Sequence, residues 1–172
     1  MEEIRDETHF EKLMEIFAPK VGREKILELI ASSKKIKAMG FWKGKNGRYP
    51  DFPHPVDFVD PDWNNEERQL VIAYLNRASI NTVQMGLSWC RFECEHVGMG
   101  GFEYTDGTYC WPEGLSHYIE KHDVRLPDEF VQHVFRNLDS RFPEDAEENT
   151  VLLSFFAPDF IWWKSQEGWK KY

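Results

Sequence analysis

Two cysteines and two histidines have the residue types, and the order along the chain, of a zinc site: Cys90, Cys94, His117 and His122. Thiolate sulfur and imidazole nitrogen are the usual ligands of a structural zinc ion. The spacing fits only in part. On an extended strand the two cysteines would lie about 13 Å apart at ~3.3 Å per residue, and no glycine lies between them to ease a turn. On a helix the two histidines diverge by about 140°, so one ion could bind both only where the helix ends or distorts. We therefore expect no cofactor, with zinc as the alternative.

Other reactive side chains give weaker signals. Cys110 is expected to point away from the aromatic side of a hairpin, so we predict it to be the most reactive thiol. A nucleophilic site would need a base beside Cys94 or Cys110, and His117 is a candidate. Glu113 and His117 form an i, i+4 pair that could act as acid and base, but such pairs are ordinary on helix surfaces. Phosphate-binding glycine loops, nucleophile elbows and EF-hand loops do not occur in the sequence. We assign no catalytic residue and favour a protein that is not an enzyme.

Length and charge restrict the classes of partner. The chain has 172 residues, the size of one domain, and 7 Trp and 13 Phe provide large side chains for its core. The net charge of −9 argues against nucleic acids and anionic membranes as partners and favours a basic protein. Three cysteines cannot all pair within one chain, and a basic, apolar leader does not begin the sequence, so we expect a cytoplasmic protein. Its longest apolar stretch is interrupted by Pro158 and Asp159, so we expect no transmembrane segment.

The elements before the cysteines are expected to be mainly helical. A capping box at Thr8 and two apolar stripes predict an N-terminal helical hairpin over residues 1–39. Residues 40–63 mix proline, glycine and aromatic residues, which predicts an ordered loop held to the core by its rings. A helix should follow, capped by Asn64 or Asn65, with a buried face made of Leu70, Val71, Tyr74 and Leu75. Alternation from Val83 to Trp89 then indicates a strand.

A tight hairpin should follow the cysteines. Asp106-Gly107 is a preferred dipeptide for a two-residue type I′ turn. That turn pairs Tyr104 with Tyr109 and Phe102 with Trp111. The pleat then places these four rings on one side of the sheet, where we expect them to be buried.

Two helices are predicted after the hairpin. Pro112 suits the first turn of one of them, with Glu113 near the positive end of its dipole. On this helix His122 should lie at the edge of the core and His117 on the solvent side, where Glu113 could orient it. The other helix should begin at Pro127 and bury Val131, Val134, Phe135 and Leu138.

Residues 54–131 resemble a group of bacterial proteins of unknown function. The resemblance is carried by "SWCRFEC", which contains a Cys-Arg-Phe-x-Cys element, and by "TDGTYCWPEGLSHY" with its Thr-Asp-Gly turn and Trp-Pro-Glu-Gly-Leu corner. It implies one integral domain and a shared feature between Cys90 and His122, and it implies no reaction. Within these motifs we assign as binding residues Arg91, Asp106, Trp111, Glu113 and His117.

We expect a single α+β domain over residues 1–172, in which a small antiparallel sheet and several helices form a core over residues 64–172. Rings crowd the last 18 residues, and we expect them to dock on the domain. Our functional prediction is a non-enzymatic protein-binding module, of the kind that immunity proteins and antitoxins exemplify. The alternative is a zinc-binding protein, or a thiol- or metal-dependent enzyme that uses the region from Cys90 to His122.

Overall fold

A five-stranded sheet lies at the centre of the fold in the computed structural model, which describes residues 19, 22–24, 27–28, 34–45, 49–83, 88–94, 98–139 and 157–169. The strands, in the order β2-β3-β4-β1-β5 across the sheet, are β1 Lys35–Ala38, β2 Ser79–Val83, β3 Phe102–Thr105, β4 Tyr109–Pro112 and β5 Ala157–Asp159. The α+β class is confirmed, but the sheet is mixed. β2, β3 and β4 are antiparallel, whereas β1 pairs in parallel with β4 and β5. Segments from distant parts of the sequence thus complete the sheet beside the hairpin.

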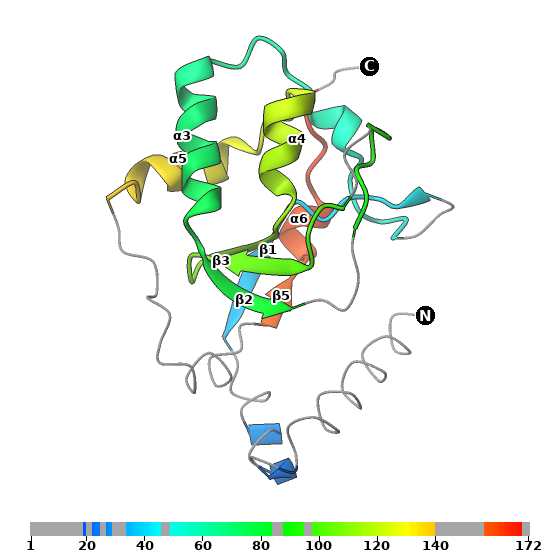
Figure 1. The fold of residues 1–172 in the computed structure, drawn as a ribbon, viewed down its shortest axis with the longest axis vertical. Helices are drawn as coiled ribbons and strands as arrows, with labels where there is room; N and C mark the ends of the chain where they lie inside the picture. The colour runs from blue at the N-terminus through cyan, green and yellow to red at the C-terminus, as the bar shows by residue number, and fades with distance from the viewer. Residues whose placement is uncertain are drawn as a thin grey trace.

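The helices pack largely on one side of this sheet (Figure 1). They are α3 Asn65–Asn76, α4 Leu115–His122, α5 Asp128–Arg136 and the short α6 Ile161–Lys164, and a 3-10 helix, η2, covers Pro55–Phe58. Helix α3 packs against both α4 and α5. Among the described residues, no helix has the length and apolar character needed to cross a membrane.

Helix α3 follows its prediction closely. The Asn64 side chain accepts hydrogen bonds from the backbone N–H groups of Glu66 and Glu67, as an N-cap should. Val71, Tyr74 and Leu75 are buried, but Leu70 is 41% exposed. The prediction of a buried Leu70 was therefore wrong, because the face that contacts α4 and α5 is narrower than the apolar stripe.

The hairpin between β3 and β4 forms with a different register. Tyr104 lies opposite Trp111 and Thr105 opposite Cys110, a shift of two residues from the prediction. Gly107 has a positive φ, whereas Asp106 does not, so the turn is not type I′. The Asp106 carboxylate accepts hydrogen bonds from the N–H groups of Thr108 and Tyr109 and so stabilises a longer turn. A shift of two residues keeps each side chain on its predicted side.

Only part of the aromatic wall is buried. Tyr109 and Trp111 belong to the main core, Tyr104 is half-buried against it, and Phe102 is 37% exposed. The opposite face of the hairpin is covered as well, because Glu103, Thr105 and Cys110 are also buried. On this opposite face Cys110 packs with Ile36 and Ala38 of β1.

The N-terminal and connecting segments match their predictions in part. Most of the helical hairpin predicted for residues 1–39 lies outside the described residues, and Lys35–Ala38 form strand β1. In residues 40–63 the described part is an ordered connection whose Trp42, Phe58 and Trp63 are buried in the core. Residues 84–87 of the strand predicted up to Trp89 lie outside the described residues, and Trp89 itself is exposed and not in a strand.

Two of the described C-terminal rings dock on the domain, as expected. Trp163 is fully buried, and its indole N–H donates to the carbonyl of Phe41. Trp169 donates through its indole N–H to the carbonyl of Arg125, whose guanidinium lies 4.3 Å from the Trp169 ring centre. These contacts tie the end of the chain to two segments far away in the sequence.

The helix after the hairpin begins later than predicted. Pro112 is the last residue of β4, and α4 begins at Leu115, so the prediction of Pro112 in the first helical turn was wrong. The N–H of Glu113 donates to the carbonyl of Phe102, which extends the strand pairing by one bond. Helix α5 begins at Asp128, with Pro127 as its N-cap, close to the predicted start. It buries Phe130, which the prediction omitted, together with Val131 and Val134.

Candidate metal site

The segment that carries the cysteines folds back on itself. The N–H of Glu93 donates to the carbonyl of Cys90, which closes a turn, and Glu93 adopts a positive φ of 57°. The backbone N–H groups of Phe92 and Cys94 each act to lower the pKa of the Cys90 thiol. The two cysteines are thus brought together, although the sequence has no glycine between them. A left-handed conformation is uncommon for glutamate, and the local hydrogen bonds compensate for its cost.

The histidines lie in the first turn and at the last residue of α4. His117 is in the first turn, and His122 ends the helix before Asp123, which adopts a left-handed conformation. The N–H of Val124 then donates to the carbonyl of Tyr118, so the chain leaves the helix sharply. The imidazole rings are inclined by 67° with centres 5.1 Å apart, and they converge through their Nε2 atoms. The two residues point in different directions from the helix axis, but their side chains are long enough to bring the two Nε2 atoms close together.

Four candidate ligand atoms lie close together. They belong to Cys90, Cys94, His117 and His122, and all lie within 4.8 Å of one another. The Cys90 sulfur lies 3.2 Å from Nε2 of His122, and the Cys94 sulfur 3.3 Å from Nε2 of His117. The two Nε2 atoms are 3.2 Å apart. These four residues could hold a metal ion, which is the alternative that the sequence left open beside the expectation of no cofactor.

Three of the ligand separations are close to those of a tetrahedral zinc ion. Bonds of about 2.3 Å to sulfur and 2.0–2.1 Å to nitrogen place tetrahedral nitrogen and sulfur ligands about 3.6 Å apart, and two nitrogens about 3.4 Å apart. The observed separations of 3.2 and 3.3 Å are slightly shorter than these values. The four atoms as a group lie within 4.8 Å of one another, so the side chains would have to adjust to bind one ion. The spacings Cys-x3-Cys and His-x4-His also fall within the range that structural zinc sites use.

Burial affects the ligands in two ways. It lowers the pKa of His122 and so favours the neutral imidazole, which is the form that binds metals. It raises the pKa of Cys90, against the opposing effect of the two backbone N–H groups. A buried thiol of this kind becomes a thiolate when a cation lies beside it.

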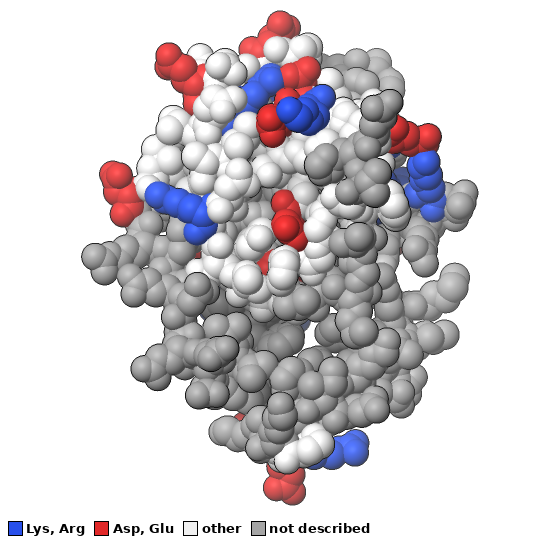
Figure 2. Space-filling view, in the orientation of Figure 1, with Lys and Arg blue, Asp and Glu red and all other residues white. Residues whose placement is uncertain are grey.

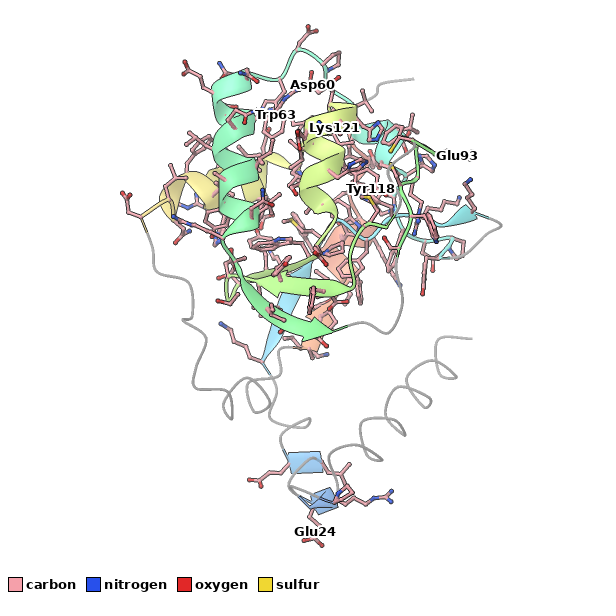
Figure 3. The ribbon with its side chains drawn as sticks, in the orientation of Figure 1. Glu24, Asp60, Trp63, Glu93, Tyr118 and Lys121 are labelled. Atoms are coloured by element: carbon pink, nitrogen blue, oxygen red, sulfur yellow. The ribbon has the colours of Figure 1, made fainter. Side chains whose placement is uncertain are left out.

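Neighbouring groups hold the turn against α4. The Tyr118 hydroxyl accepts a hydrogen bond from the N–H of Arg91, and the Phe92 ring stacks on His122 at 4.3 Å between centres. Figure 3 shows Tyr118 on the side of α4 that faces the loop with Glu93. Phe92 and Glu93 were not among the predicted site residues. The Cys-x3-Cys spacing was the available signal for a turn, and a stacking ring or a left-handed glutamate has no signature of its own.

A second set of contacts fixes the other end of the loop. The Glu113 carboxylate accepts hydrogen bonds from the N–H groups of Gly101 and Phe102. Gly100, at φ 78°, allows this approach, because a Cβ atom there would lie 1.8 Å from a Glu113 carboxylate oxygen. Ser88 and Met99 are joined by a backbone hydrogen bond, which closes the loop around the cysteines.

The predicted binding residues are distributed over several parts of the fold. His117 belongs to the cluster of four ligands, and Arg91 lies in the turn, where its guanidinium donates to the carbonyl of Trp89. Glu113 makes the loop contacts given above. Asp106 caps the hairpin turn and bonds to α3 and α5, and Trp111 is buried in the core. The structure therefore brings two of the five to the candidate site.

Cys110 has the environment of an unreactive thiol. It is fully buried in β4, and burial, with the nearby carboxylates of Glu103 and Asp106, raises its pKa far above the usual range. Because the thiolate is the reactive form, the prediction of Cys110 as the most reactive thiol does not fit its surroundings. The side of the hairpin opposite the rings is covered and does not face solvent.

A metal ion held by all four residues would have no open coordination position. Catalytic zinc sites keep one position for water or substrate, whereas structural sites are closed. Such an ion would therefore join a loop to a helix.

No family model, curated protein or solved structure matched the chain in the comparisons that we made. The resemblance of residues 54–131 to a bacterial group stays a prediction.

Proposed function

We propose that this is a zinc-binding protein in which Cys90, Cys94, His117 and His122 hold one structural zinc ion. The convergence of four ligand atoms within 4.8 Å of one another carries the proposal. Two sulfur and two nitrogen ligands favour zinc over hard cations such as magnesium or calcium, which prefer oxygen.

The ion would do a mechanical task. It would fasten the turn at Cys90 to both ends of α4, beside the hydrogen bond between Arg91 and Tyr118. Binding free energy of this kind becomes folding free energy, because the site does not exist in the unfolded chain.

Metal analysis of the full chain, purified without added zinc, tests the proposal. We expect about one zinc ion per chain, as the four-ligand set implies. The ion should be lost in Cys90→Ser and in His117→Ala. Cys110→Ala and His54→Gln are matched controls, because Cys110 is buried in β4 and His54 lies at the N-terminus of η2, and both variants should retain the metal.

A second measurement covers the case in which a ligand variant fails to fold. Wild-type protein stripped of metal would be titrated with Co²⁺, whose visible spectrum reports tetrahedral coordination and sulfur ligation. Absence of both tetrahedral and sulfur-to-cobalt bands, with no zinc in the purified protein, would overturn the proposal.

The prediction of a protein-binding module with a basic partner is a separate proposal. On the face drawn in Figure 2, acidic and basic side chains of the described residues are interspersed. The protein-binding proposal is tested by the capture of a basic protein by the full chain, with a reversed-charge surface variant as control. The zinc proposal has the more specific observation behind it.

A further inference from the structure

The two sulfur ligands are neighbours in space and on the same turn. The Cys94 and Cys90 sulfurs lie within 4.8 Å of each other. A disulfide needs its sulfurs at about 2.05 Å. Because both residues belong to one turn closed by Glu93, side-chain rotation and a local adjustment of that turn can join them. The strands and helices need not move.

The two sulfurs differ in access. Cys90 is 5% exposed and packs in the main core, whereas Cys94 is only partly buried. A small oxidant from solvent therefore reaches Cys94 first. Cys90 then lies in position to react with the oxidised sulfur.

We propose that the site is also a redox switch, in which a hydroperoxide converts Cys90 and Cys94 into a disulfide and releases the zinc ion. This inference rests on the proposed zinc site and adds a regulatory role to it.

The chemistry balances with hydrogen peroxide as the two-electron oxidant. The Cys94 thiolate takes one oxygen atom, giving a sulfenic acid and hydroxide as the O–O bond breaks. The Cys90 thiolate then attacks the Cys94 sulfur, forms the S–S bond and expels a second hydroxide. Two protons convert both hydroxides to water. Two thiolates are oxidised, one peroxide is reduced, and zinc leaves as Zn²⁺ because only two imidazoles remain to bind it.

Loss of the ion would have a local structural effect. The turn would keep the hydrogen bond from Arg91 to Tyr118. It would lose its connection through the zinc ion to His117 and His122. The loop closed by Ser88 and Met99 would then open more easily from α4.

Cys110 provides an internal control. It is fully buried on a strand in the middle of the sheet, and it belongs to a separate cluster with Ile36 and Ala38. A peroxide that acts only on accessible sulfur should leave it reduced.

The experiment uses the zinc-loaded full chain, treated with hydrogen peroxide beside a chromogenic zinc chelator. We expect release of one zinc ion for each disulfide formed, peptide mapping that assigns the disulfide to Cys90 and Cys94, and recovery of zinc binding after a thiol reductant. Cys110→Ala should respond at the same rate as wild type.

Three results would overturn the switch. These are retention of zinc at peroxide concentrations that oxidise an exposed model thiol, irreversible sulfinic acid at Cys94 without a disulfide, or a disulfide that includes Cys110. If the chain neither contains nor binds zinc before peroxide is added, the proposed function itself has failed, so the two failures are distinguishable.

Discussion

Two polar clusters connect turns of the chain with the helices, and they are built in different ways. In the first, the Asp106 carboxylate accepts hydrogen bonds from the Tyr74 hydroxyl and from Nε2 of His133, both at 2.8 Å. It also accepts the two backbone N–H groups of its own turn. Each of these four bonds pairs a proton donor with a lone pair of the carboxylate.

The second cluster is built differently. Nε2 of His117 and Nε2 of His122 lie 3.2 Å apart, and each also contacts a cysteine sulfur. Each Nε2 offers either one proton or one lone pair, so it cannot make a good hydrogen bond to both of its neighbours. A cation at the centre would instead accept one lone pair from each of the four ligand atoms. Histidine bonds to a carboxylate in the first cluster, whereas in the second it belongs to a group that could hold a metal ion.

Removal of the metal should have the largest effect. With free zinc a thousandfold above its dissociation constant, a chelator is expected to lower the free energy of unfolding by about 4 kcal/mol. Urea unfolding of wild-type protein with and without the chelator measures this change. The double variant Cys90→Ser/Cys94→Ser should show no response, and an equal response would mean that the chelator acts elsewhere.

Asp106→Ala should break the first cluster and leave the second intact. The side chain is 3% exposed and accepts bonds from four groups, so we expect a loss of about 3 kcal/mol in the free energy of unfolding. Zinc content, measured in the folded variant, should stay at the wild-type level. A folded Asp106→Ala protein without zinc would show that the two clusters are not independent.

Gly100→Ala tests the support of the metal loop. The added Cβ collides with Glu113 at a positive φ, and we expect a cost of about 2 kcal/mol together with weaker zinc binding in a competitive titration. Gly22→Ala is the matched control, because Gly22 has a similar φ of 88° but open space around a Cβ. It should cost about 1 kcal/mol, from backbone strain alone, and leave zinc affinity unchanged. Equal zinc affinity in both variants would contradict the assigned role of Glu113.

The smallest expected effect concerns Glu129, next to the first cluster. Hydrogen bonds from Lys37, Tyr109 and Trp162 lower the pKa of its carboxyl, with Lys37 contributing most. Because the folded-state pKa is depressed, this stabilisation is present above the pKa of the unfolded chain and disappears as the pH falls through the folded value.

Glu129→Gln should therefore unfold with a weaker dependence on acid pH than wild type. The side chain is 48% exposed, so the difference should stay below about 1 kcal/mol at neutral pH. Urea unfolding at a series of acid pH values measures it, and zinc content near neutral pH should not change. An unchanged acid profile would mean that solvent screens these contacts fully.

Local patterns predicted several elements well. Asn64 and the apolar spacing after it were sufficient to predict α3, and the residues from Pro127 onward were sufficient to predict α5. The hairpin was predicted in place but with the wrong register, because the Asp106 side chain replaces the backbone geometry of a two-residue turn. The partners of β1 could not be predicted, since parallel pairing joins segments far apart in the sequence.

For the candidate site, the sequence by itself determined the four ligand types, their order and their spacing. It could not decide whether Cys90 and Cys94 lie along a strand or on a turn, because Glu93 adopts its left-handed conformation only within the surrounding hydrogen bonds. The tertiary structure decided that α4 ends at His122 and that the cysteine turn packs against it. Metal binding depends on convergence in space, and contacts between distant segments determine that convergence.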